Sequence, residues 1–282
     1  MCLVIEMGSR ANSNWAGSYD VMATNTKQPL SRKDHFVPQG YLRGFVHPAR
    51  IRHPKPLWVF DVQRSRWDQK STSQFGFERG FYDYSSGSEP DATAEDLFKR
   101  PENDFPLIRD QIRNEGYSTW LQHRGPLLSF AALLTARSQL FRDQCASGIL
   151  PSLTSCASKE TLAKNYSITT MRSETPRRAT EWKMYHWVLR YTTNPDFPVI
   201  ASDQSVGMMA SAKNQPEAYQ NRDFWLWFPI SWDTCLIGST IPLRNESTAE
   251  FEEAHVAEIQ KLVCSYAALF VVSPVQLSGV AA

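Results

Sequence analysis

The sequence predicts an α+β fold in which a mixed or antiparallel sheet packs against a helical layer within a single domain. The composition is that of a globular protein, with 42% hydrophobic and 21% charged residues. The length of 282 residues suits one large domain or two small ones. Strand-like segments come first, helical segments follow, and further strands and a last helix end the chain. This order differs from the regular β-α-β alternation of a parallel sheet.

Residues 34–275 are expected to form this domain, and residues 276–282 are expected to be a tail. Residues 1–33 are expected to be a flexible lead-in, because they are rich in Ser, Asn, Ala and Thr and show little apolar periodicity. Early in the domain, the segments 57–62 and 80–84 are rich in β-branched and aromatic residues. They predict two short strands.

Apolar residues recur at helical spacing in three segments, 105–113, 126–144 and 248–270. Each segment therefore predicts a helix with one apolar face that can pack against the sheet. Ser247 or Thr248 is suited to cap the third helix, because its hydroxyl can accept a hydrogen bond from a free backbone N–H.

The segment between the second and third helices is less regular. Residues 147–180 are polar and mixed, and they predict a helix with loops. Strands are predicted at 198–202, 224–230 and 234–238, where β-branched and aromatic residues gather. The tryptophans of this part of the chain are of a type that stacks on nucleic-acid bases, but core packing explains their place in strands more simply.

Residues 34–45 read Asp-His-Phe-Val-Pro-Gln-Gly-Tyr-Leu-Arg-Gly-Phe. This segment resembles the opening signature His-x-Val-Pro-x-x-Tyr-Leu-Arg-x-Phe of the family known as domain of unknown function 4238. The resemblance extends over residues 34–275. It implies positions to examine but no chemistry, because the family name carries no activity. Shorter matches follow in the order of the family pattern, at 81–83, 130–142, 200–203 and 228–231.

His35 is the first candidate for a catalytic residue. A histidine can act as a general base or a metal ligand, and the neighbouring Asp34 could orient it. The Asp-His-x-Val-Pro order is similar to the first half of ββα-metal nucleases, in which the histidine activates water. Gln39 and Arg43 follow closely and are candidates for substrate binding. The alternative is that His35 only hydrogen-bonds the backbone where the strand begins.

Arg137 is the second candidate, because it falls on the apolar stripe of its predicted helix. A buried arginine is costly unless a carboxylate or a phosphate meets its fork of donors. The partner could be Glu95, Glu102 or Asp203, or it could be an anionic ligand. Arg142 follows on the same helix and is a candidate for substrate binding. The alternative is a structural tie between helix and sheet.

Asp203 is the third candidate, because it follows an apolar strand and strand ends often carry functional residues. Together with Glu102 it could hold a divalent metal ion, or it could cap the next turn through its side chain. Pro101 and Pro106 argue against a continuous helix through Glu102. His255 lies on the apolar stripe of the last predicted helix and is expected to be a core histidine.

The charge and the cysteine content limit which binding partners and which cell compartment are expected. The formal net charge is +1, so the chain as a whole is not attracted to nucleic acid or anionic lipid. The basic residues in 27–55 could steer a phosphate-bearing ligand, or they could pair with the acidic residues in 78–104. The 5 cysteines are scattered, which predicts reduced thiols and a cytoplasmic protein. No apolar run approaches the roughly 18 residues of a membrane span, so no membrane partner is expected.

These candidates support two functions. The first is a phosphodiester hydrolase acting on nucleic acid or nucleotides, with His35 as base or metal ligand and Arg137 steadying the phosphate. A divalent metal held by Asp203 and Glu102 is the cofactor this function would use. The second is a non-catalytic binding or interaction protein, in which the same residues form a buried structural network. The motifs of Walker-type nucleotide hydrolases, Rossmann proteins, α/β-hydrolases and zincins are absent from the sequence.

Overall fold

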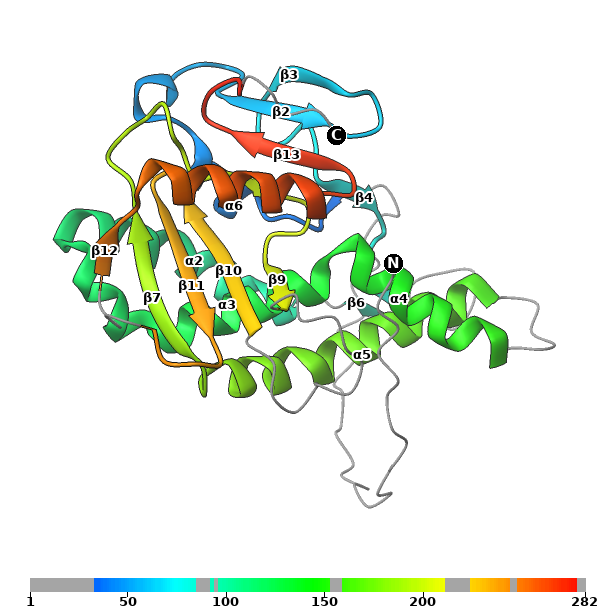
Figure 1. The fold of residues 1–282 in the computed structure, drawn as a ribbon. Helices are drawn as coiled ribbons and strands as arrows, with labels where there is room; N and C mark the ends of the chain where they lie inside the picture. Colours follow the sequence, from blue (N-terminus) through cyan, green and yellow to red (C-terminus); the bar gives the residue numbers. More distant parts are fainter. Residues whose placement is uncertain are drawn as a thin grey trace.

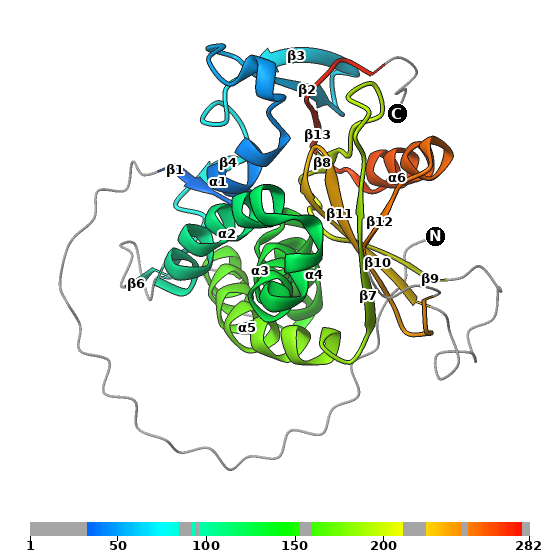
Figure 2. The same cartoon turned by 90° about the vertical axis from the view of Figure 1, so that its left-hand side faces the viewer.

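The computed structural model describes residues 33–84, 92–93, 96–152, 159–210, 224–243 and 248–277. The expected lead-in, apart from Lys33, and residues 278–282 of the expected tail lie outside this part of the chain. The fold is α+β, as predicted. A mixed sheet carries a layer of helices on one face, and a smaller sheet lies beside it (Figures 1 and 2). None of the described helices is long and apolar enough to cross a membrane.

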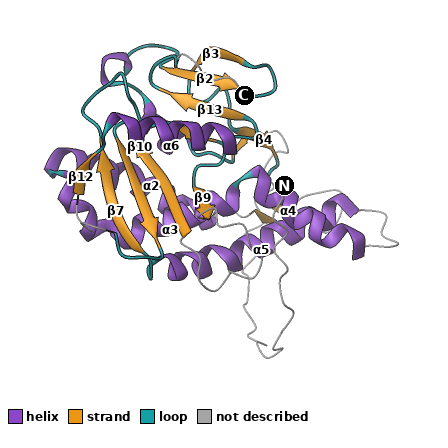
Figure 3. Ribbon diagram, in the orientation of Figure 1, coloured by secondary structure: helices purple, strands orange, loops and turns teal. Residues whose placement is uncertain are grey.

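The main sheet is mixed. Its strands are β7 (His186–Tyr191), β9 (Gly207–Ala210), β10 (Phe224–Ser231), β11 (Thr234–Ser239) and β12 (Thr248–Glu250). They lie in the order β12-β7-β11-β10-β9. Only β12 runs parallel to its neighbour, β7, and the other pairs are antiparallel (Figure 3). The strands predicted at 224–230 and 234–238 are thereby confirmed.

The smaller sheet joins segments that are far apart in the sequence. Its strands are β2 (Leu57–Asp61), β3 (Arg66–Lys70), β8 (Ala201–Ser202) and β13 (Phe270–Ser273), in the order β3-β2-β13-β8. Two further pairs are β1 (Lys33–His35) with β4 (Phe77–Arg79), and β5 (Asp83–Tyr84) with β6 (Ala92–Thr93). The strand predicted at 57–62 is confirmed, whereas those at 80–84 and 198–202 are each only two residues long.

The described helices are α1 (Gln39–Leu42), α2 (Asp96–Glu115), α3 (Arg124–Arg137), α4 (Gln139–Ile149), α5 (Lys159–Trp182) and α6 (Glu253–Tyr266). Four of these six described helices, α2 to α5, follow one another in the middle of the chain. Short 3₁₀ turns are η1 (Arg43–Phe45), η2 (Pro48–Arg50), η3 (Tyr117–His123) and η4 (Leu150–Ser152). In Figure 2, α2, α3 and α5 lie on one side of the main sheet and α6 lies on the other.

The helix predicted at 105–113 is longer than expected, because α2 continues through both Pro101 and Pro106. Each proline removes one backbone hydrogen bond. The helix nevertheless buries Phe98, Phe105 and Ile112, each no more than 2% exposed. Burial of such side chains contributes about 1.5–3 kcal/mol each, which outweighs the lost hydrogen bonds. This extension matters for the site, because it places Glu102 on a continuous helix.

The helix predicted at 126–144 is in fact two helices, α3 and α4. The chain breaks at Ser138, whose ψ of 150° is extended rather than helical. The Ser138 hydroxyl accepts a hydrogen bond from the backbone N–H of Phe141 at 3.2 Å and so caps α4. The hydrophobic periodicity continues across the break, which explains why the sequence predicts one helix.

Two other predictions are also corrected. The mixed segment 147–180 is dominated by the 24-residue helix α5. The helix predicted at 248–270 is the strand β12, the shorter helix α6 and the first residue of β13. The N-cap position of α6 is Glu252, and its side chain makes no capping hydrogen bond. Phe270 at the far end of this segment belongs to β13, and Phe251 lies between β12 and α6.

The core lies between the main sheet and the helical layer. Phe228 of β10 stacks on Tyr41 of α1, with 6.1 Å between ring centroids. Phe105 of α2 stacks on Phe130 of α3, with 4.1 Å between ring centroids. The buried Tyr41 hydroxyl donates a hydrogen bond to the carbonyl of Pro229 at 2.9 Å. The contacts of Tyr41 tie the 34–45 segment to β10 of the main sheet.

Candidate functional site

The predicted site residues fall into two groups, and the first surrounds Arg137 at the end of α3. We call His35, Gln39, Tyr82, Glu102 and Arg137 the Arg137 cluster. The members come from β1, α1, the turn before β5, α2 and α3. Folding therefore brings together four predicted residues that are up to about a hundred positions apart, and it adds Tyr82, which lies in the 81–83 match but was not a candidate.

Arg137 is only 3% exposed and uses its whole guanidinium group within the protein. Nε donates a hydrogen bond to the Tyr82 hydroxyl at 2.8 Å. Nη1 forms an ion pair with Glu102, and Nη2 donates to the backbone carbonyl of His35. The rings of Tyr82 and Phe98 lie against the guanidinium, at 5.0 and 4.2 Å from its carbon. The cost of burying the charge is thus offset by hydrogen bonds, one carboxylate and two aromatic faces.

The protonation of this cluster follows from burial and charge. Burial alone would lower the pKa of Arg137, but its interactions with Tyr82 and Glu102 raise that pKa above its usual value. Burial raises the pKa of Tyr82 above the ordinary range for a phenol, although Arg137 acts in the opposite direction. Arg137 is therefore a cation and Tyr82 a neutral phenol at physiological pH, as their hydrogen bond requires.

Asp34 positions Tyr82 rather than His35. One Asp34 carboxylate oxygen accepts a hydrogen bond from the Tyr82 backbone N–H at 3.3 Å. The turn before Tyr82 contains Gly80, whose φ of +60° lies in the left-handed region that favours glycine. A Cβ at Gly80 would also lie 2.9 Å from a carboxylate oxygen of Asp83. Lys164 of α5 donates to the Gly80 carbonyl at 2.5 Å and holds the turn against the helical layer.

His35 is half-buried at the edge of the cluster. Its Nε2 lies 3.3 Å from the Gln39 amide nitrogen, and its ring packs against Phe77 at 5.5 Å between centroids. Burial, and then the positive charges of Arg137 and Lys33, lower the pKa of His35 below its ordinary value. The imidazole is therefore neutral at physiological pH, and Gln39 is placed to hydrogen-bond it.

The other two predicted arginines lie outside the cluster. Arg142 of α4 pairs with Glu78 of β4 at 3.0 Å, and its guanidinium carbon lies 4.6 Å from the Phe81 ring centroid. Glu78 lies opposite Asp34 in the β1–β4 pair, so Arg142 adjoins the cluster. Arg43 is exposed on η1 and makes none of the contacts of the cluster.

Asp203 has a different set of partners. One of its oxygens, Oδ1, accepts hydrogen bonds from the backbone N–H groups of 268–270, at 3.1, 3.0 and 3.2 Å. Oδ2 accepts a hydrogen bond from the Gln204 amide at 3.1 Å. Burial raises the pKa of Asp203, and these hydrogen bonds act against that rise. Asp203 therefore caps the turn between α6 and β13, not the next turn along the chain.

In the structure, Glu102 pairs with Arg137, and Asp203 hydrogen-bonds the backbone of 268–270. Among the described residues, no three His, Cys, Asp or Glu side chains are grouped as metal ligands would be. A cavity of about 450 Å³ lies next to the cluster, lined by Phe77 and Glu78 together with residues of the smaller sheet. His35, Arg137 and Asp203 are not among the residues that line it.

The structure contains a second buried polar network, which the sequence did not predict. Asp233, in the turn between β10 and β11, pairs with Arg113 of α2 at 3.0 Å. Asp233 also accepts a hydrogen bond from Ser231 at 2.5 Å and one from Thr234 at 3.2 Å. This network fastens the end of α2 to the main sheet. The only sequence signal for it is the Pro-Ile-Ser step at 229–231, which belongs to the motif order noted above.

The histidine expected in the core is exposed. The His255 side chain is 59% exposed and lies 3.9 Å from Glu252 on the same helix. The inward positions of α6 are Val256 and Val263. His255 lies beside them, at the rim of a pocket between α6 and the main sheet. The apolar stripe predicted for this helix is therefore shifted around the helix axis.

The fold and the cluster define an α+β protein in which a buried arginine joins the 34–45 motif to the first long helices. The chain belongs to the family described as Protein of unknown function (DUF4238), whose model matches residues 33–274. The resemblance seen in the sequence is thereby confirmed. No curated protein and no solved structure matches the chain.

Proposed function

We propose that this protein is a non-catalytic binding protein in which the predicted His, Arg and Asp residues serve structure. The observation that carries the proposal is that each nitrogen of the Arg137 guanidinium already has a partner, in Tyr82, Glu102 and the His35 carbonyl. A phosphate at this position would have to displace a carboxylate and a carbonyl from a side chain that is 3% exposed. An arginine that binds substrate keeps donors free for it.

The surroundings of Asp203 support the same proposal. A carboxylate that binds a divalent cation directs free lone pairs toward it. Three backbone N–H groups occupy one Asp203 oxygen, and the Gln204 amide occupies the other. This is how a carboxylate caps a turn.

The competing proposal is a phosphodiester hydrolase that acts on nucleic acid or a nucleotide with a divalent metal. One observation favours it, because the pKa of His35 is lowered by burial and nearby positive charge. A half-buried neutral imidazole is suited to accept a proton from water. The hydrolase would need His35 alone to supply this function, since Arg137 and Asp203 are engaged elsewhere.

A nuclease assay separates the two proposals. The purified protein is incubated with single-stranded DNA, RNA and a dinucleotide, with and without Mg²⁺ or Mn²⁺. We expect no cleavage above the level of His35→Gln. His53→Gln is the matched control, because His53 is exposed and lies outside the cluster. Metal-dependent cleavage that is lost in His35→Gln and kept in His53→Gln would overturn the binding proposal.

We also propose a cytoplasmic location. Cys145, Cys235 and Cys264, which are the cysteines among the described residues, are all free thiols. Free thiols in a folded chain are typical of a reducing compartment. Fractionation of cells, with detection of the protein by antibody, tests this location.

A further inference from the structure

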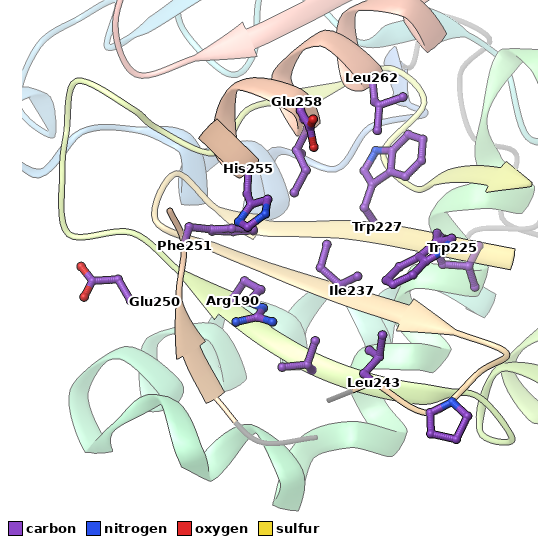
Figure 4. A pocket seen from close by; sticks show the side chains of 14 residues that line it. Arg190, Trp225, Trp227, Ile237, Leu243, Glu250, Phe251, His255, Glu258 and Leu262 are labelled. Atoms are coloured by element: carbon purple, nitrogen blue, oxygen red, sulfur yellow. The ribbon is translucent and has the colours of Figure 1, made fainter. Parts of the chain in front are cut away.

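A hollow lies away from the Arg137 cluster, between α6 and the main sheet (Figure 4). Its volume is about 550 Å³. This volume falls within the roughly 300–1,000 Å³ that is typical of small-molecule sites. Most of its wall is apolar and comes from three strands, from α6 and from the segment after β11. The apolar side chains that matter here are Val188, Trp225, Trp227, Ile237, Leu243 and Leu262.

The pocket exists because the two faces of the main sheet are covered unequally. The helices α2, α3 and α5 lie over one face, whereas α6 crosses one end of the strands on the other face (Figures 1 and 2). On that second face, Trp227 of β10, Ile237 of β11 and Val188 of β7 are register partners across the sheet. They form an apolar row along the pocket, in which Ile237 is the partly exposed member and the other two are buried.

Arg190 is the charged residue built into this apolar surface. It follows Val188 by two residues on β7, so both side chains point to the same face of the sheet. Arg190 lines the pocket together with His255 and Phe251 (Figure 4). Among the described residues, the Arg190 side chain has no carboxylate within ion-pairing distance. Arg137 makes the contrast clear, because there every guanidinium nitrogen has a partner.

The other charged groups at the pocket point elsewhere or lie at its rim. Glu250 accepts a hydrogen bond from the Thr193 hydroxyl at 2.7 Å. Glu258 and His255 are exposed on α6, at the edge of the hollow. The half-buried Arg190 is therefore the ionic group set among the apolar side chains of the floor. In such surroundings a guanidinium binds a carboxylate with two parallel hydrogen bonds more strongly than it does in water.

We propose that this pocket binds an amphipathic monocarboxylate, such as a medium-chain fatty acid. The carboxylate pairs with Arg190, and the apolar tail lies over Ile237 and Trp225 toward Leu243. The inference deepens the proposed function and rests on it, because it names the ligand class of the binding protein. His255 lines the same pocket and is a second polar group available to the head group.

The test is a titration of tryptophan fluorescence, since Trp225 and Trp227 line the pocket. Three ligands of equal chain length are compared below their micelle concentrations: decanoate, decanol and decylamine. We expect decanoate to bind about tenfold or more tightly than decanol, which is the usual worth of a hydrogen-bonded charge pair. Equal binding of decanoate and decanol, or preference for decylamine, would overturn the proposal without any variant.

Variants of Arg190 sharpen the test. Arg190→Met should remove the preference for decanoate, and Arg190→Glu should reverse it toward decylamine. The matched control is Arg172→Met, because Arg172 is exposed on α5 and is not one of the residues that line the pocket. Circular dichroism and the thermal midpoint confirm that each variant is folded. Decanoate binding that Arg190→Met leaves unchanged contradicts the proposal.

The two proposals fail in different ways. Absence of decanoate binding, together with absence of nuclease activity, removes the ligand class and leaves the binding function standing. Nuclease activity that depends on His35 removes the binding function whatever the pocket binds.

Discussion

Replacement of Arg137 by methionine tests whether the cluster is structural. Methionine keeps the side-chain length and the packing against Phe98, but it removes every donor. Breaking a buried ion pair by removing one partner costs about 3–5 kcal/mol. Two features place the cost of Arg137→Met near the lower end of this range. The Glu102 side chain is 32% exposed and can be hydrated again, and the Tyr82 hydroxyl still reaches the His35 carbonyl at 3.4 Å.

We therefore expect Arg137→Met to lower the free energy of unfolding by about 3 kcal/mol. The measurement is urea denaturation followed by circular dichroism and tryptophan fluorescence. The control is Arg177→Met on α5, where the arginine is 59% exposed although it pairs with Glu174 and Glu181. Its loss should cost no more than about 1 kcal/mol.

A double-mutant cycle with Glu102→Gln identifies the partner. If the ion pair between Arg137 and Glu102 contributes as the structure indicates, the double variant should lose less stability than the sum of the two single variants. Additive losses would show that the pair is not coupled. An Arg137→Met protein as stable as the wild type, within about 0.5 kcal/mol, would refute the structural role altogether.

Two further predictions concern the other members of the predicted site. Asp203→Ala leaves three backbone N–H groups without an acceptor, so it should lower the free energy of unfolding by about 2–4 kcal/mol, whereas Asp203→Asn keeps one oxygen and should lose less. Urea denaturation of both variants checks this order, and equal losses would contradict it. His35 has a lowered pKa in the folded protein, so the unfolded chain binds more protons as the pH falls below the ordinary value of 6.5. Stability should therefore fall between pH 7 and pH 5, and His35→Gln should weaken this dependence. The thermal midpoint measured across that range is the test, and an unchanged slope in His35→Gln would count against it.

Several properties follow from local sequence alone. The α+β class, the family, and the strands β2, β10 and β11 can all be predicted from composition, motifs and runs of β-branched and aromatic residues. The sequence also predicts that Arg137 needs a partner. Because this residue falls on the apolar stripe of its helix, its charge is buried and the cost of burial must be offset by another group. Chemical type and spacing are sufficient for such properties.

The choice of partners depends on the tertiary structure. Arg137 was open to Glu95, Glu102, Asp203 or a ligand, and the packing of α2 against α3 selects Glu102. That packing also keeps α2 helical through Pro101 and Pro106, which local propensity disfavours. Asp203 meets the backbone of 268–270 only because β8 pairs with β13.

The pocket beside α6 is the clearest product of tertiary structure. Val188, Trp227 and Ile237 have the hydrophobic character of core residues, and in sequence nothing separates them from side chains that the helical layer covers. The hollow arises because α6 is shorter than its periodicity suggests and crosses only one end of the sheet. Local pattern fixes which side chains avoid water, whereas the lengths and crossing positions of distant elements decide which of them line a pocket.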